Sequence, residues 1–175
     1  TLADQGVLFL DELAEFERPV LEALRQPLEE GRVAIVRAGR ATIFPARFQL
    51  VAAMNPCPCG QAGVEGGNCD CQREVVQRYS ARISGPLRDR IDLWVMMPRV
   101  PPTALLALDE PEASESVAGR IAAAQARQHD RSLDLNARLS GRRLMAVAGL
   151  TGKGRARLAA LADLEALSAR GTERL

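Results

Sequence analysis

Two acidic side chains follow directly on a short apolar run near the start of the chain. Val7–Leu10 are apolar, and Asp11 and Glu12 come next. If the run is a strand of a parallel sheet, both carboxylates lie at its carboxyl end, where α/β sheets bind their ligands. Asp11 could hold Mg²⁺ there, and Glu12 could polarise an attacking water. A strand leading into a helix N-cap would show the same letters, so the pair alone leaves both interpretations open.

Further polar side chains are predicted at the ends of other strands. Asn55 follows the apolar run Phe48–Met54 and could orient the water or touch a γ-phosphate, although Asn-Pro is also an ordinary turn start. Arg90 lies just before the apolar run Leu93–Met97, where an arginine can reach a phosphate bound to a neighbouring subunit. A surface ion pair with a nearby aspartate is the alternative for Arg90.

Four cysteines gather in one stretch and form two close pairs. The pattern is C-x-C-x9-C-x-C, made by Cys57, Cys59, Cys69 and Cys71. Four thiolates can complete a tetrahedral Zn²⁺ site, although the usual knuckle spacing is CxxC rather than CxC. Structural disulfides are uncommon in cytosolic chains. We therefore favour structural zinc, with disulfides formed on purification and free thiols as the alternatives.

A basic hairpin is predicted between the first two strands. The stretch from Gly31 to Phe48 contains four arginines and no acidic residue. Two β-strand patterns flank a turn at Ala38-Gly39, which places Arg37 and Arg40 at the tip. A basic tip could follow a phosphate backbone. A solvated turn in an arginine-rich protein remains an open alternative.

The elements that must position these groups are strands and helices up to residue 98 and helices afterwards. Buried strands are predicted for Val7–Leu10, Phe48–Met54 and Leu93–Met97, because each is a short continuous apolar run. Apolar spacing with Pro and Gly punctuation predicts helices over residues 18–30, 72–82, 87–92, 102–108, 112–131, 140–148, 151–167 and from 168 onward. The fold class is therefore α/β for residues 1–98, followed by an all-helical domain over residues 99–175.

Composition excludes some classes of function. The 175 residues are 47% hydrophobic, enough for one substantial domain or for one domain plus a small one. The formal net charge of +1 excludes a globally basic nucleic-acid-binding protein and leaves local basic patches open. No signal peptide and no apolar run near the ~18 residues of a membrane span occur. We expect a cytoplasmic protein without a membrane partner.

Three motifs in order along the chain resemble one known family. GVLFLDEL, AAMNPCPCG and RYSARISGPLRDRID are similar to the magnesium-chelatase-like AAA+ ATPases, most closely the branch of ComM and YifB, over residues 1–98 and more weakly beyond. The resemblance implies that Asp11 and Glu12 are the Walker B acids for Mg²⁺ and the catalytic water. It implies that Asn55 is the sensor-1 residue and Arg90 the arginine finger. Arg170, in LSARGTERL, is similar to the sensor-2 arginine that contacts ATP.

The resemblance also implies partners and cofactors. Members of the family bind ATP and Mg²⁺ between subunits of a ring, which we expect to be a hexamer. Their β-hairpins before sensor 1 point toward the central pore, so Arg37 and Arg40 are expected to contact DNA there. The branch carries a similar cysteine-rich loop, which we expect to brace the region between Asn55 and the helix before Arg90.

The phosphate-binding loop of such an ATPase is absent from the chain. No GxxxxGK[ST] occurs, and the similar segment 149–154 lacks the spacing and a Ser or Thr after Lys153. In the AAA+ pattern the P-loop precedes Walker B, so we expect it upstream of Thr1. The chain would then be the C-terminal part of an AAA+ core, residues 1–98, with a truncated helical lid, residues 99–175. We expect that it alone neither binds ATP tightly nor hydrolyses it.

A missing P-loop strand would have a structural consequence. That strand is expected between the Phe48–Met54 strand and the Leu93–Met97 strand, and without it two sheet edges stay open. Open edges predict rearrangement, strand exchange or a disordered segment. Direct pairing of the two flanking strands would contradict this expectation.

Three functions stay open at this point. The favoured one is an ATP-driven DNA motor, with branch migration during recombination of incoming DNA as the specific activity. The first alternative is the ATPase subunit of a magnesium-chelatase-type complex that inserts metal into a tetrapyrrole. The second is a non-enzymatic, zinc-braced interaction module.

Overall fold

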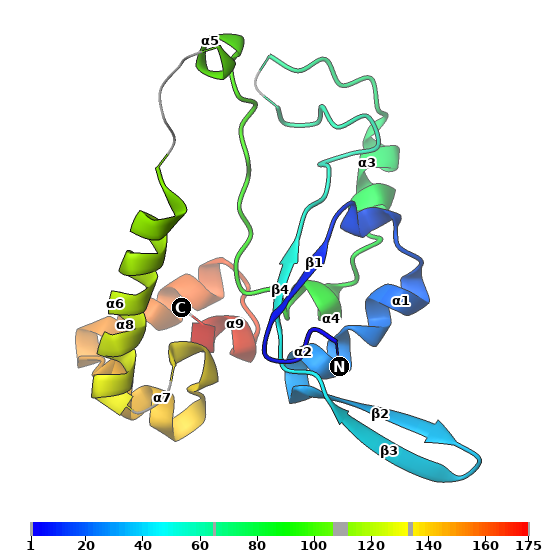
Figure 1. Ribbon diagram of the computed structural model, residues 1–175. Coiled ribbons are helices and arrows are strands. Elements are labelled where there is room, and N and C mark those ends of the chain that lie inside the picture. Colours follow the sequence, from blue (N-terminus) through cyan, green and yellow to red (C-terminus); the bar gives the residue numbers. More distant parts are fainter. Residues whose placement is uncertain (1, 65, 107–111, 133–134, 175) are drawn as a thin grey trace. The chain divides into compact units, whose positions relative to one another are not determined.

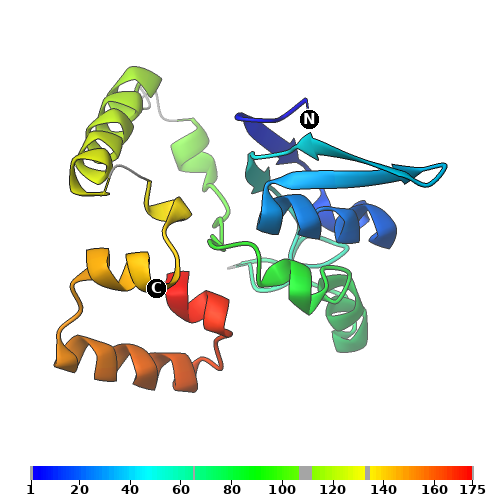
Figure 2. The same cartoon turned by 90° about the horizontal axis from the view of Figure 1, so that it is seen from below.

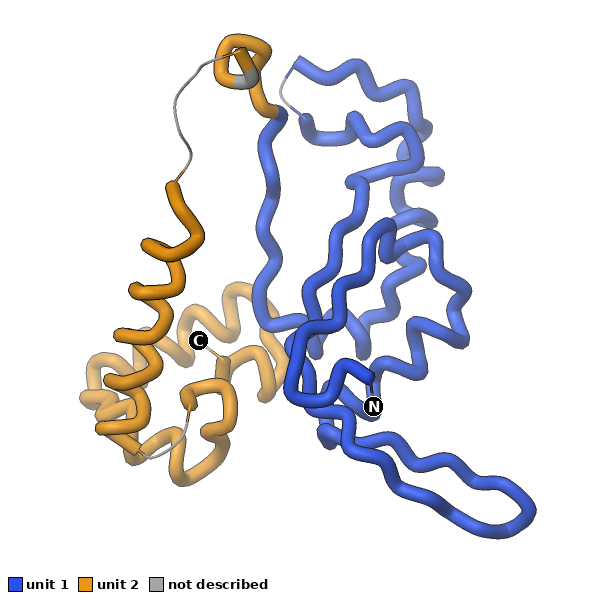
Figure 3. The backbone as a smooth tube through the Cα atoms, viewed as in Figure 1, with its two compact units in different colours: residues 1–99 blue, residues 100–175 orange. Residues whose placement is uncertain are grey.

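The computed structural model describes residues 2–64, 66–106, 112–132 and 135–174. The chain divides into two compact units, residues 1–99 (unit 1) and 100–175 (unit 2), which Figure 3 shows in two colours. Unit 1 is mixed α/β, and the described part of unit 2 is helical. The end of the helix predicted for residues 102–108 lies outside the described residues.

Two parallel strands form the centre of unit 1. Strand β1 (Val7–Leu10) pairs with β4 (Gln49–Ala52) in a register that sets Leu10 opposite Ala52. Figure 1 shows the two strands side by side. Both strands were predicted, but the prediction that they are buried on both faces is wrong. Phe9 is 60% exposed, because the described sheet has only these two strands and one face of it is left uncovered.

The predicted hairpin is confirmed and forms a separate two-stranded sheet. Strands β2 (Arg32–Arg37) and β3 (Arg40–Pro45) pair antiparallel, and Arg37 faces Arg40 across the turn. Gly39 has φ 75°, as this tight turn requires. Figures 1 and 2 both show the tip extending beyond the helices of unit 1.

Short helices cover the inner face of the β1–β4 sheet. They are the 3-10 helix Leu13–Glu15 and the helices α1 (Arg18–Ala23), α2 (Arg25–Glu30), α3 (Arg73–Ser80) and α4 (Gly85–Arg88). The helix predicted as continuous over residues 18–30 is broken at Leu24. Proline lacks the N–H that would bond the carbonyl of Ala23, so Pro27 explains the break. Gly31 then ends α2 in the left-handed conformation, as predicted.

The buried core of unit 1 lies beneath the carboxyl end of β1. Leu13, Leu21, Ile83 and Leu87 form one cluster. Leu10, Met54 and Ile91 are among the partly buried residues that pack against it. The residues directly after β1 and β4 are therefore held by the best-packed part of the unit.

The predicted third strand is not formed. Residues 93–97 pair with no described strand, and Leu93 is 82% exposed. Their composition suits a strand, but a strand is defined by hydrogen bonds to a neighbour, and none lies beside them. The predicted turn of helix at residues 87–92 is also shifted, because Ser84 caps α4 through the Leu87 amide and starts the helix at Gly85.

Unit 2 is a set of helices joined by short connections. They are α5 (Pro102–Leu105), α6 (Ser114–Ser132), the 3-10 helix Asn136–Arg138, α7 (Gly141–Ala148), α8 (Gly152–Leu164) and α9 (Ala169–Arg174). Segment 149–154 begins a helix, since the Thr151 hydroxyl accepts the Gly154 amide at 3.1 Å. Among the described helices, none combines the length and the apolar character needed to cross a membrane.

Candidate functional site

Two strand ends bring the predicted catalytic side chains to one edge of the sheet. Asp11 and Glu12 follow β1, and Asn55 follows β4 by three residues. Two hydrogen bonds continue the pairing past the strands: Ala53 N–H donates to Leu10 O (2.9 Å), and Leu13 N–H donates to Ala53 O (2.8 Å). The three polar side chains are exposed at this edge, which we call the carboxylate edge.

The backbone at Glu12 has an unusual conformation. Its φ and ψ are 49° and 45°, in the left-handed region that side-chain-bearing residues rarely adopt. The Glu12 amide donates to Asp11 Oδ1 at 2.8 Å, which ties the two acids together locally. Such strained residues gather at functional sites when the surrounding structure holds them. Here the support is direct, since the next residue, Leu13, belongs to the buried core.

Asn55 packs against the first turn of the cysteine loop. The Gly60 amide donates to the Cys57 carbonyl at 3.0 Å and closes that turn, with Gly60 at φ 76°. A Cβ atom added at Gly60 would lie 3.8 Å from Asn55 Oδ1. The asparagine is therefore adjacent to the turn that carries Cys57 and Cys59.

The four cysteines lie together and are free thiols. Their Sγ atoms all lie within 4.8 Å of one another, and the closest approaches are 3.3 Å (Cys57–Cys59), 3.6 Å (Cys59–Cys69) and 3.8 Å (Cys57–Cys69). A tetrahedron with Zn–S bonds of about 2.3 Å has S···S edges of about 3.8 Å. The donor set and its spacing fit a tetrathiolate metal site, and Cys57 is fully buried beneath it.

The thiols differ in acidity because each one alters its neighbours. Burial would raise the pKa of Cys57, but hydrogen bonds from Cys59 and the Ala62 amide outweigh it and lower the pKa to about 6. An amide hydrogen bond from Cys71 lowers the pKa of Cys69, but burial and the neighbouring thiols outweigh it and raise the pKa to about 12. A divalent cation bound here would displace the proton that Cys69 retains beside the more acidic Cys57.

Arg90 is held within unit 1. Its Nε donates to Glu29 Oε2 at 3.0 Å, its Nη2 contacts the same oxygen, and its Nη1 donates to the Pro86 carbonyl at 2.7 Å. The Arg90 side chain is only 14% exposed. The predicted arginine finger is thus engaged in cis.

Arg37 and Arg40 are exposed at the tip of the β2–β3 hairpin. The register pairs Val33 with Phe44 and Ile35 with Thr42 on the same face as the two arginines, since residues two apart on a strand share a face. Ile35 is exposed as well. This face therefore presents two guanidinium groups beside exposed apolar side chains.

Arg170 lies in unit 2 on α9 and is half-buried. Its Nε is buried and has no hydrogen-bond partner among the described residues. This N–H group is therefore unsatisfied and shielded from solvent within the described part of unit 2.

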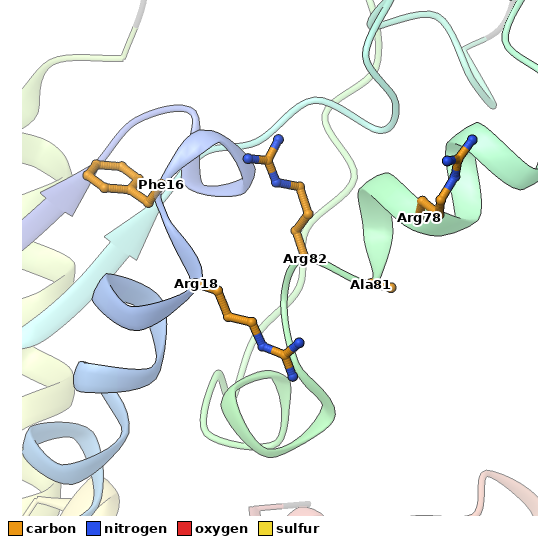
Figure 4. Close-up of a pocket in the computed structure, with 5 residues that line it drawn as sticks. All are labelled: Phe16, Arg18, Arg78, Ala81 and Arg82. Carbon is orange, nitrogen blue, oxygen red and sulfur yellow. The ribbon is translucent and has the colours of Figure 1, made fainter.

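A cavity of about 250 Å³ opens elsewhere in unit 1. Its lining residues, labelled in Figure 4, are Phe16, Arg18, Arg78, Ala81 and Arg82. Figure 4 shows the Arg18 and Arg82 side chains pointing in different directions, and Arg82 pairs with Glu15 at 3.1 Å. The guanidinium groups do not converge on a common point, so the cavity does not form an anion site.

Two features of unit 1 were not predicted from the sequence. Glu29 is the partner of Arg90 from 61 residues away, and only the fold brings the two together. The left-handed backbone of Glu12 carries no sequence signal either, because no glycine or asparagine stands there.

Two family models match the chain. The model for magnesium chelatase, subunit ChlI, matches residues 1–105, and the model for the C-terminal part of that subunit matches residues 111–175. Together they cover nearly the whole chain.

Individual relatives agree with the family models. The chain is 46% identical to the uncharacterized protein YifB of Salmonella typhimurium and 45% identical to the competence protein ComM of Haemophilus influenzae, over 145 residues in each case. It is 48% identical to YifB of Escherichia coli over 138 residues. These alignments cover 78–82% of the chain and 27–28% of each relative, so the chain spans less than a third of their length.

Proposed function

Because the chain belongs to the magnesium chelatase subunit ChlI family, we propose that it is part of an AAA+ ATPase that assembles into a ring and moves DNA. The observation that supports the proposal is the carboxylate edge, where the paired strands β1 and β4 end and are followed by Asp11, Glu12 and Asn55. Carboxylates with an amide at the carboxyl end of adjacent parallel strands are the arrangement that phosphate hydrolysis needs.

Each residue at the edge receives a role in this proposal. Asp11 holds Mg²⁺, and Glu12 takes the proton of the attacking water. Asn55 orients that water. Bound ATP with Mg²⁺ supplies the phosphoryl group and neutralises the charge that develops on it. The exposure of all three side chains suits an edge that is completed by other parts of the protein.

Two arginines complete the nucleotide site in the proposal. Arg90 would act on the phosphate of ATP bound to a neighbouring subunit, and Arg170 of α9 would be a second phosphate ligand. The P-loop would be supplied by a part of the protein that this chain does not contain. The small share of each relative that the chain covers supports this arrangement.

DNA is the proposed substrate because of the hairpin. Arg37 and Arg40 stand at an exposed tip, and one relative is named a competence protein. Branch migration during recombination of incoming DNA is the activity we propose. Metal insertion into a tetrapyrrole by a chelatase-type complex is the second candidate, favoured by the name of the matching family.

Hydrolysis is tested with the full-length protein. Glu12→Gln should abolish ATP hydrolysis while leaving nucleotide binding intact, since the amide cannot accept the water's proton. Glu17→Gln removes an equal charge from an exposed acid nearby and should hydrolyse ATP normally. Normal hydrolysis by the Glu12→Gln protein would contradict the proposal. Function of the full-length protein that survives Glu12→Gln although hydrolysis is lost would favour the non-enzymatic, metal-braced interaction module.

DNA dependence is tested at the hairpin. The double reversal Arg37→Glu and Arg40→Glu should remove DNA stimulation of the ATPase, because it replaces two phosphate contacts with repulsion. Reversal of Arg155 and Arg157, two exposed arginines of α8, is the charge-matched control. Stimulation by branched DNA that survives the hairpin reversal would contradict the contact proposed for Arg37 and Arg40. A wild-type protein that does not bind branched DNA would leave chelatase-type remodelling as the better proposal.

The cysteine cluster is proposed to hold structural Zn²⁺ through Cys57, Cys59, Cys69 and Cys71. The support is the fit of the Sγ spacing to a tetrathiolate site. Gently purified protein should contain one zinc per chain, and Co²⁺ in its place should give the absorption of tetrahedral thiolate coordination. Metal-free protein with four free thiols after purification in zinc-containing medium would contradict the assignment.

A further inference from the structure

The contact between Arg90 and Glu29 occupies the edge of the guanidinium that recognises phosphate. Nε and Nη2 both bond Glu29, and Nη1 bonds the Pro86 carbonyl. The planar fork formed by Nε and Nη2 is the part of an arginine that makes paired contacts to carboxylate or phosphate oxygens. Arg90 therefore cannot present this fork to a phosphate while Glu29 holds it.

Glu29 stands at the joint between α2 and the hairpin. It is the next-to-last residue of α2, which is capped by Gly31. Strand β2 starts directly afterwards, at Arg32. Its carboxylate side chain is 53% exposed, whereas Arg90 is 14% exposed. The acid is thus the accessible partner, and a movement of the end of α2 displaces it from Arg90.

The base of the hairpin is fastened to α2. Gln26 Oε1 accepts the Ala34 amide at 3.4 Å, and Arg32 pairs with Glu30 at 2.9 Å. The Ala46 amide donates a hydrogen bond to Gly31 O at 2.9 Å. Strand β2 is therefore bonded to α2 at Gln26 and Glu30, and the residue after β3 is bonded to Gly31, directly after the helix.

The Arg47 side chain packs closely against Gly31 at this joint. A Cβ atom added at Gly31 would lie 2.7 Å from Arg47 Cγ, and Gly31 has φ 66°. The Arg47 amide is fixed in turn by Asp4 Oδ1 at 2.8 Å. Only Gly31 separates the end of α2 from strand β2, so a movement of the hairpin has a short path to Glu29.

We propose that Glu29 is a positioning residue that holds Arg90 in cis and releases it when the hairpin engages nucleic acid. This inference rests on the proposed function, in which Arg90 serves a neighbouring subunit's ATP and the hairpin binds DNA. Glu29 and the phosphate compete for the same fork, so the Arg90–Glu29 pair couples the two sites. The pair sets the ATPase rate without DNA, and its opening accounts for stimulation by DNA.

The first experiment uses the chain as it stands. Proton exchange at Arg90 Nε is measured by nuclear magnetic resonance in the wild type and in Glu29→Gln. Loss of the charged acceptor should speed this exchange by about tenfold. Glu15→Gln is the matched control, because it breaks another Glu–Arg pair of similar sequence separation, Glu15–Arg82, without touching Arg90 or the hairpin. Equal exchange rates in the wild type and Glu29→Gln would overturn the inference.

The second experiment uses the full-length protein with and without DNA. Glu29→Gln should raise the DNA-free ATPase rate by about tenfold and reduce stimulation by DNA to near unity, and Glu15→Gln should do neither. Arg90→Ala should be inactive in both conditions. If Arg90→Ala is inactive while Glu29→Gln behaves as the wild type or is also inactive, the inference is wrong and the proposed function stands. If Arg90→Ala hydrolyses ATP normally, the role proposed for Arg90 fails as well.

Discussion

The cysteine cluster and the carboxylate edge are neighbouring sites built in opposite ways. All four thiols of the candidate metal site come from the 15-residue stretch Cys57–Cys71, and their Sγ atoms lie within 4.8 Å of one another. Asp11, Glu12 and Asn55 come from two strands and are exposed, with the two acids bonded only locally. The first site is complete within one loop, whereas the second presents three groups at an open edge.

This difference shows what each site depends on. A site whose ligands are close in sequence needs only a few turns, such as the one that Gly60 closes beneath Cys57. A site assembled from strand ends needs the sheet and the core to be in place before its groups meet. We therefore expect the cysteine cluster to survive changes in the core and the carboxylate edge to fail with them.

The largest effect is expected from removing a sulfur ligand. Cys69→Ser should lower zinc affinity more than about a hundredfold, because losing a ligand exceeds the cost of losing a supporting contact. Pro58→Ala alters the same loop without removing a ligand and should keep one zinc per chain. Zinc content by elemental analysis and proteolysis of the loop measure both. Unchanged zinc in Cys69→Ser would mean that the cluster is not the binding site.

Zinc binding should also depend steeply on pH. The pKa of Cys57 is lowered from 9.0 to about 6, so its thiolate is present above pH 6 and is lost as the pH falls through that value. The pKa of Cys69 is raised to about 12, so its proton must be displaced by the metal. Affinity should therefore rise with pH above about 6 and collapse below it. A competition titration with a chelator across this range measures the change, and a flat profile would exclude thiolate ligands.

The stability of the metal-free chain should also depend on pH through the same thiols. A lowered pKa in the folded state means that Cys57 stabilises the fold at and above pH 9.0, and that this stabilisation declines as the pH falls toward about 6. The raised pKa of Cys69 acts in the opposite sense, because its stabilisation is present below pH 9.0 and is lost as the pH rises toward about 12. Urea unfolding of metal-free wild type against Cys57→Ser should show a difference that grows from pH 6 to pH 9 and not below. A constant difference would contradict the assignment.

A substitution in the core should disrupt the carboxylate edge and leave the cysteine cluster intact. Leu13 follows Glu12 directly and is almost fully buried in the core cluster. Leu13→Ala should destabilise unit 1 by about 2–5 kcal/mol, whereas Leu93→Ala, at an exposed position, should change stability by less than about 0.5 kcal/mol. Urea unfolding measures both. Zinc content should be the same in the two variants, and loss of zinc from Leu13→Ala would show that the two sites are not independent.

Local features of the fold could be predicted from the sequence, and features that need partners could not. The hairpin, the strands β1 and β4, the Gly31 helix end and the clustering of the cysteines each follow from residues close in sequence. The strand at residues 93–97 was predicted from its composition and is absent, because strand formation needs a neighbour that composition cannot supply. For the same reason, burial of β1 and β4 was overestimated.

The candidate site shows the same division. Adjacent parallel strands bring Asp11 and Asn55 to one edge, which follows once the two strands are paired. The Arg90–Glu29 pair depends on how α2 packs beside the segment after α4, and nothing in either local sequence indicates it. Ion pairs between elements that are distant in sequence leave no pattern in a single sequence, so this contact could not be predicted.

The smallest expected effect separates function from stability at the carboxylate edge itself. The left-handed backbone of Glu12 is strained, since that conformation brings Cβ close to the following carbonyl. Glu12→Gly removes the clash and should stabilise the chain by about 0.5–1 kcal/mol, although glycine loses more chain entropy on folding. Gln77→Gly, in helix α3 with ordinary dihedrals, should instead cost about 1 kcal/mol. A gain in urea resistance together with loss of hydrolysis in the full-length protein would mean that hydrolysis needs the Glu12 carboxylate despite the backbone strain at this residue. A loss of stability would mean that Glu12 makes contacts that outweigh its backbone strain.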